Sequence, residues 1–136
     1  MDKPGMDRIP EGTLVVVADG EGARVFRNVG KGRALSLHQV ELLEARDLND
    51  DGPAGMLPKE QTGEQIDEAT FAKQLAHRLN DGALKNEYAH LVLVADPQTL
   101  GQVRPQLHKE TLQRTLGEVA KTLTNATLEE IERALS

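Results

Sequence analysis

The sequence predicts a single α/β domain in which helices cover a mixed β-sheet. Its 136 residues are enough for one domain with a hydrophobic core. Two apolar runs, residues 14–18 and 91–95, are short, rich in valine and continuous rather than alternating. A continuous apolar run indicates burial on both faces, as at the centre of a sheet that helices cover. We therefore expect these two runs to be central strands.

Short glycine-rich turns connect the first three predicted strands. Residues 23–29 follow a turn at 19–22, and residues 35–43 follow Gly30-Lys31-Gly32. Links this short can join only antiparallel strands. The first part of the chain therefore predicts an antiparallel meander, and its third strand, at an edge of the sheet, offers a surface for a homodimer.

A polar segment at residues 45–65 separates this meander from the first predicted helix. It holds glycines, two prolines and a cluster of acidic residues. A stretch of this length without regular structure is typical of a functional or disordered loop. The predicted organisation is a flexible tail at 1–12 and one domain at 13–136 that carries a mobile loop at 45–65.

Two helices are predicted on either side of the second apolar run. Apolar residues recur every four positions over 71–79, and Gly82 is suited to end that helix. Asp96 and Pro97 read as the N-cap and first residue of a second helix that extends to about residue 107. The two helices would cover the central strands.

The C-terminal third contains one clear helix and one ambiguous segment. Thr127 and Glu130 form a capping box at the start of the last helix. Residues 109–123 have helical apolar spacing, but Gly117 and several threonines favour a strand. If 116–123 is a strand, the element order is that of a ribonuclease H-like sheet, and the right-handed crossover rule places the two apolar runs side by side.

Composition excludes several classes of function. Cysteine is absent, so disulfides, thiolate metal sites and cysteine nucleophiles are excluded. The four histidines lack metal-ligand spacing and Ser36 lies in no nucleophile motif, so we expect no cofactor and no triad chemistry. A net charge of -6 makes the chain as a whole a poor binder of nucleic acid. Without an apolar leader or membrane-length run, we expect a cytoplasmic protein with no membrane partner.

Charge is segregated along the chain. Residues 41–70 hold nine acidic residues against two basic ones. Residues 23–40 hold no acidic residue and four basic ones, namely Arg24, Arg27, Lys31 and Arg33. The functional interpretation is an RNA or ribosome contact through the basic residues, with the acidic loop as a mobile partner or autoinhibitor. A separate alternative is an adaptor whose acidic loop 45–65 docks a protein partner. The alternative is that the strand arginines only solvate the sheet, and the odd spacing of Arg24 and Arg27 would point them to opposite faces.

Two aspartates follow the two apolar runs directly. If these runs are adjacent parallel strands, Asp19 and Asp96 lie at the same carboxyl edge, where ligands tend to bind in open sheets. Clustered carboxylates can hold Mg²⁺ ions for phosphodiester cleavage, which makes a nuclease an alternative function. The structural interpretation is a turn residue for Asp19 and a helix cap for Asp96. Other carboxylates that could join such a cluster are Glu64, Asp67, Glu68, Glu129 and Glu130.

Four segments resemble a known bacterial family: TLVVVADGEGARVF at 13–26, FAKQLAHRL at 71–79, LVLVADPQTLG at 91–101 and LGEVAKTLT at 116–124. The chain resembles the host attachment protein family, also called "protein required for attachment to host cells", from about residue 13 to residue 135. That family is similar to the middle domain of archaeal and eukaryotic class-one peptide release factors, which has a ribonuclease H-like sheet. The resemblance implies a fifth strand near 114–123 and a five-stranded sheet in the order 3-2-1-4-5.

The same resemblance suggests a role for the end of the long loop. In the release-factor domain, a Gly-Gly-Gln tip between the third strand and the first helix reaches the peptidyl-transferase centre. The equivalent residues here are Gly63, Glu64 and Gln65, with a glutamate in place of the second glycine. The resemblance implies a non-enzymatic release-factor-like module with the ribosome or tRNA as partner, and an attachment phenotype rather than a surface adhesin. The alternatives are the Mg²⁺-dependent nuclease and the protein-binding adaptor.

Overall fold

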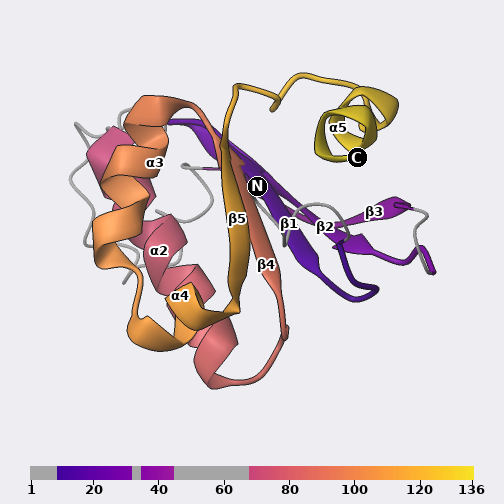
Figure 1. The fold of residues 1–136 in the computed structure, drawn as a ribbon. Helices are drawn as coiled ribbons and strands as arrows, with labels where there is room; N and C mark the ends of the chain where they lie inside the picture. Colours follow the sequence, from indigo (N-terminus) through magenta and orange to yellow (C-terminus); the bar gives the residue numbers. More distant parts are fainter. Residues whose placement is uncertain (1–8, 32–34, 45–67) are drawn as a thin grey trace.

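A five-stranded mixed sheet forms the centre of the molecule (Figure 1). The computed structural model describes residues 9–31, 35–44 and 68–136. The strand order is β3-β2-β1-β4-β5. This confirms the predicted α/β class and the order 3-2-1-4-5. The strands are β1 (Leu14–Ala18), β2 (Gly22–Asn28), β3 (Leu37–Glu44), β4 (Leu91–Ala95) and β5 (Thr115–Ala120).

The two apolar runs are neighbours at the centre of the sheet, as predicted. β1 and β4 pair in parallel from Leu14 with Leu91 to Ala18 with Ala95. Every residue of both strands is buried. β1 pairs antiparallel with β2, and β2 pairs antiparallel with β3, which confirms the meander. The continuous apolarity of the two runs therefore reflects cover on both faces of the sheet.

Helices cover the two faces unequally. One face carries α2 (Glu68–Leu84), α3 (Pro97–Val103), a 3₁₀ turn η4 (Arg104–Gln106) and α4 (Lys109–Arg114), whereas the short helix α5 (Leu128–Leu135) lies on the other (Figure 1). On the first face, alternate residues of β1 and β4 pack against α2 residues such as Phe71, Leu75 and Leu79. On the second face, the remaining strand residues pack with Ile131 and Leu135 of α5.

Both predicted helix caps are present. The Asp96 side chain accepts a hydrogen bond from the Thr99 backbone N–H, and Pro97 occupies the first helical turn. Thr127 and Glu130 form the reciprocal capping box of α5. The second helix is shorter than predicted, because α3 ends at Val103 and the chain continues as η4, which contains Pro105. Proline has no backbone N–H to extend an α-helix.

The ambiguous segment 109–123 contains both predicted structures. Residues 109–114 form α4, and the chain then enters β5 at Thr115 and pairs in parallel with β4. Leu116 and Val119 pack against the core beneath α5. The helical spacing therefore corresponds to a helix only over residues 109–114. Residues 115–120 form a strand instead, because the edge of β4 supplies hydrogen-bond partners for their backbone. This confirms the fifth strand that the family resemblance implied.

β3 is the free edge strand that the sequence suggested for a homodimer. A register shift between Val25 and Phe26 interrupts its pairing with β2. The side chain of Glu41 on this strand forms an ion pair with Arg78 of α2. Bulges and charges on an edge strand discourage pairing with another chain. The homodimer stays a prediction.

Two predicted regions lie largely outside the described residues. The loop 45–65 is outside them, and the tail 1–12 is described only from Ile9 onward. Ile9 is buried, and its carbonyl accepts a hydrogen bond from Asn28 Nδ2 at 2.9 Å. Among the residues that the structure describes, no helix has the length and apolarity needed to cross a membrane.

Candidate functional site

Asp19 and Asp96 lie at the same carboxyl edge of the sheet. They directly follow Ala18 and Ala95, which pair with each other at the ends of β1 and β4. This is the juxtaposition that a parallel pair of strands predicts. The contacts of each carboxylate then indicate whether it is available for a ligand.

Asp19 uses both of its oxygens within the protein. Its Oδ1 accepts hydrogen bonds from the backbone N–H groups of Glu21 at 2.8 Å and Gly22 at 3.0 Å. Its Oδ2 accepts a hydrogen bond from the Thr124 hydroxyl at 2.7 Å. Asp19 therefore closes the turn between β1 and β2 and holds the segment that follows β5.

Both carboxylate oxygens of Asp96 also accept hydrogen bonds within the protein. Its Oδ2 accepts from the Thr99 backbone N–H at 3.1 Å, and its Oδ1 accepts from the Thr99 hydroxyl at 2.7 Å. Within residues 9–31, 35–44 and 68–136, no group of three or more histidine, aspartate or glutamate residues is placed to hold a metal ion. The contacts favour the turn and cap roles over a metal site.

Two of the other predicted carboxylates lie in the first turn of α5. Glu130 accepts a hydrogen bond from the Thr127 backbone N–H as part of the capping box. Glu129 is exposed on the first turn of α5. Glu68 is the first residue of α2, and Glu64 and Asp67 lie outside the described residues, as does the Gly63–Gln65 tip.

Arg24 is bound to the protein itself rather than presented to solvent. Its Nη1 donates to the backbone carbonyls of Thr124 at 3.1 Å and Ala126 at 2.8 Å, and its Nε donates to Gln39 Oε1 at 3.1 Å. Its guanidinium carbon lies 5.0 Å from the centre of the Phe26 ring. Arg24 therefore fastens the approach to α5 onto the sheet.

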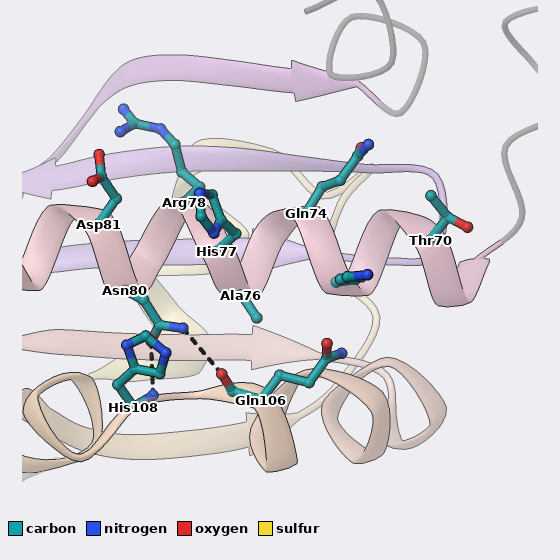
Figure 2. A pocket seen from close by; sticks show the side chains of 10 residues that line it. Thr70, Gln74, Ala76, His77, Arg78, Asn80, Asp81, Gln106 and His108 are labelled. Carbon is teal, nitrogen blue, oxygen red and sulfur yellow. Dashed lines mark hydrogen bonds between the residues drawn. The ribbon is translucent and has the colours of Figure 1, made fainter. Parts of the chain in front are cut away.

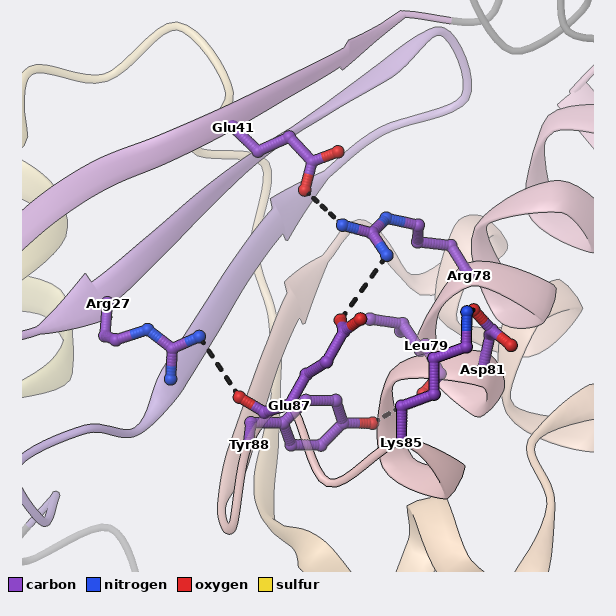
Figure 3. A network of polar contacts seen from close by, with 8 residues as sticks. All are labelled: Arg27, Glu41, Arg78, Leu79, Asp81, Lys85, Glu87 and Tyr88. Atoms are coloured by element: carbon purple, nitrogen blue, oxygen red, sulfur yellow. Dashed lines mark hydrogen bonds and ion pairs between the residues drawn. The ribbon is translucent and has the colours of Figure 1, made fainter.

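Arg27 points to the opposite face, as its odd spacing from Arg24 predicts. Its Nη1 donates to the Gly12 carbonyl at 2.9 Å and its Nη2 donates to the Glu87 carbonyl at 3.3 Å (Figure 3). Lys31 is exposed, and Arg33 lies outside the described residues. The structure therefore does not bring Arg24, Arg27 and Lys31 together as one free basic patch.

A polar network joins α2 to the meander beside Arg27 (Figure 3). Arg78 lies 2.6 Å from Glu41 and 3.5 Å from Glu87. The hydrogen bond to Glu41 raises the pKa of Arg78 above its usual value. Tyr88 donates its hydroxyl hydrogen to the Leu79 carbonyl at 2.7 Å, and burial raises the pKa of this phenol. These contacts serve to hold α2 on the sheet.

The sequence interpretation missed an open groove of about 610 Å³ between α2 and the turn from η4 to α4. Asn80 organises it, because this buried side chain accepts from the His108 backbone N–H at 2.8 Å and from the Thr111 hydroxyl at 2.7 Å. Its Nδ2 donates to the Gln106 carbonyl at 3.0 Å (Figure 2). Side chains that line the groove include Lys73, His77, Asn80, Asp81, Gln106 and His108.

A sequence signal for this groove exists on only one of its walls. Lys73 and His77 are four residues apart, which places them on one face of a helix. His77 is exposed on α2. His108 comes from a turn about thirty positions later, so only the packing of α4 against α2 brings it to the same groove.

The comparison with protein families gives one match across this fold. The family model described as "Bacterial archaeo-eukaryotic release factor family 12" matches residues 12–135. No match was found among curated proteins. The matched range includes all five strands and both walls of the groove. It confirms the release-factor kinship that the sequence resemblance implied.

Proposed function

The chain belongs to bacterial archaeo-eukaryotic release factor family 12, and we propose that it acts as a non-enzymatic module that binds the ribosome. The family match carries this proposal, because it covers nearly the whole chain rather than a single motif. Ribosomal RNA or tRNA is the partner expected of a release-factor-like domain. A ribosome-bound role implies a cytoplasmic location.

The chemistry of two regions supports binding without catalysis. Asp19 and Asp96 have protein donors on every carboxylate oxygen, so a Mg²⁺ ion would have to displace hydrogen bonds that close a turn and cap a helix. At the loop tip, Glu64 stands where the release-factor motif has glycine. A glutamate restricts the backbone and brings negative charge towards a phosphate-rich tRNA end.

The name of the resembling family adds a further expectation. We propose that host attachment, if this chain affects it, is an indirect consequence of a role in translation. Deletion of the gene would then change polysome profiles before it changed adhesion to a host surface. Altered adhesion with an unchanged polysome profile would contradict an indirect role.

Co-sedimentation with ribosomes tests the proposed function directly. Purified wild-type protein is expected to travel with ribosomes through a sucrose gradient at low salt and to be released as salt is added, because phosphate contacts are screened. Protein that stays at the top of the gradient at low salt would overturn the proposal. Arg24 and Arg27 are unsuitable for the matching variant, because their contacts with backbone carbonyls support the fold.

A further inference from the structure

We infer that the groove between α2 and the η4–α4 turn binds phosphate groups, and that single-stranded RNA supplies them. This inference names a contact surface for the proposed ribosome-binding module, and the choice of RNA rests on that proposed function.

Two charged residues of the groove are neutralised by neighbours. Arg78 pairs with Glu41 at 2.6 Å and with Glu87 at 3.5 Å. Asp81, the one acidic residue of the lining, pairs with Lys85 at 3.1 Å. Arg78 is thus flanked by two carboxylates and Asp81 by one ammonium group, so neither residue is a free charge in the groove. The character of the groove is therefore set by its remaining polar side chains.

The remaining titratable side chains are all nitrogen donors. The side chains of Lys73, His77 and His108 line the groove, are exposed, and have no hydrogen-bond or ion-pair partner in the part of the chain that the structure describes. An ammonium group and imidazole N–H groups suit the oxygens of a phosphate, and charge-assisted hydrogen bonds of this kind are the stronger ones. The groove is thus an anion-favouring surface on a chain of net charge -6.

The two walls hold the backbone of these three residues in a fixed arrangement. Lys73 and His77 lie one turn apart on α2, whose opposite side is buried in the core. His108 is the N-cap residue directly before α4, and its backbone is fixed by the hydrogen bond from its N–H to Asn80 (Figure 2). A backbone that is already positioned leaves only the side chains to be ordered when a ligand binds. A ligand in the groove can therefore meet donors from both walls.

The shape of the groove favours a phosphate chain over base recognition. The groove is open along α2 rather than closed around a single small molecule, and the described residues of its lining include no Phe, Tyr or Trp ring, which leaves the small imidazoles of His77 and His108 as its ring side chains. Backbone phosphates are regularly spaced and need no aromatic platform. We therefore expect weak, sequence-independent and strongly salt-sensitive binding of RNA.

Binding measurements on exposed variants test the inference. We expect a short fluorescent single-stranded RNA to bind wild-type protein at low salt, and the Lys73→Gln/His77→Gln double variant to bind at least about fivefold more weakly. For Lys73→Gln alone, the slope of log affinity against log salt should fall by about 0.7, the value for one single-strand phosphate contact. Lys109→Gln is the matched control, because Lys109 is exposed on α4 next to His108 but does not line the groove.

Inorganic phosphate distinguishes the two sources of the ligand. If RNA and inorganic phosphate both shift the backbone amide resonances of Lys73, His77 and His108, the inference is supported. Shifts with inorganic phosphate but no RNA binding would overturn RNA as the ligand and leave a small-phosphate site. No shift with either probe, or equal loss of RNA binding in Lys109→Gln, would overturn the site itself.

The gradient experiment separates this inference from the proposed function. If wild-type protein and the Lys73→Gln/His77→Gln variant sediment equally with ribosomes, the groove is not the contact surface and the proposed function stands. If only the variant is released, both are supported. If wild-type protein does not sediment, the proposed function fails, and the RNA and phosphate titrations decide the groove on their own.

Discussion

The guanidinium of Arg24 donates a hydrogen bond to the Ala126 carbonyl at 2.8 Å, although 102 positions separate the two residues. The same nitrogen also donates to the Thr124 carbonyl. These hydrogen bonds join β2 to the segment between β5 and α5. A residue that the sequence alone suggests as an RNA contact is thus part of the structural framework.

Replacing Arg24 should destabilise the protein. We expect Arg24→Gln to lower the free energy of unfolding by about 1–3 kcal/mol, because two backbone carbonyls lose a charged donor. Urea denaturation measures this loss. The control is Lys31→Gln, an exposed residue of the same predicted basic segment, which should change stability by less than about 0.5 kcal/mol. Equal effects of the two variants would contradict the structural role of Arg24.

Replacing Asp96 should separate capping from catalysis. Asp96→Ala should cost about 1 kcal/mol of stability, whereas Asp96→Asn keeps an N-cap acceptor and should remain close to wild type. Thermal or urea unfolding compares the two variants. Neither variant nor wild type is expected to cleave labelled RNA in the presence of Mg²⁺. Cleavage by wild type that Asp96→Asn abolishes would instead support the nuclease alternative.

Removing Asn80 should loosen the turn from η4 to α4. Asn80→Ala leaves the His108 N–H, the Thr111 hydroxyl and the Gln106 carbonyl without their partner, and we expect a loss of about 2–3 kcal/mol. Hydrogen exchange should show that the His108 amide exchanges faster in Asn80→Ala than in wild type, whereas amides in β1 exchange at the same rate in both. Gln113→Ala, at an exposed position on α4, is the control and should leave both quantities unchanged. An unaltered His108 amide in Asn80→Ala would contradict the role of Asn80.

Tyr88 should make the protein less stable at high pH. Burial raises the pKa of its phenol in the folded state, so the folded protein holds the proton more tightly than the unfolded chain does. The free energy of unfolding should therefore decrease as pH rises above about 10, the ordinary value for tyrosine. Tyr88 is the only tyrosine, so tyrosinate absorbance reports its ionisation directly.

The matching variant for this effect is Tyr88→Phe. Because this variant lacks the hydrogen bond to the Leu79 carbonyl, its free energy of unfolding at neutral pH should be about 1 kcal/mol lower than that of wild type. Its free energy of unfolding should also decrease less steeply at high pH. Parallel pH dependence of wild type and variant would show that other groups cause the decrease. An absorbance titration with an ordinary midpoint would contradict the raised pKa.

Several elements of this protein follow from patterns local to the sequence. A stretch of about ten residues is enough to predict each of these features. They are the continuous apolar runs of β1 and β4, the glycine-rich turns of the meander, and the helix caps at Asp96 and Thr127. Local patterns succeed here because burial on both faces, tight turns and helix ends each impose their own residue requirements over a short stretch.

Long-range packing decided the rest. Residues 115–120 became β5 against their helical spacing, because β4 offers an edge with unpaired backbone groups. Asp19, Arg24 and Arg27 bond to residues far along the chain, and Asp96 bonds to Thr99 in the helix that follows it. These bonds occupy the groups that a ligand would need. His108 lines the same groove as His77 because Asn80 holds the turn of His108 against α2. Such contacts depend on which segments the sheet brings together, and no short stretch of sequence encodes that.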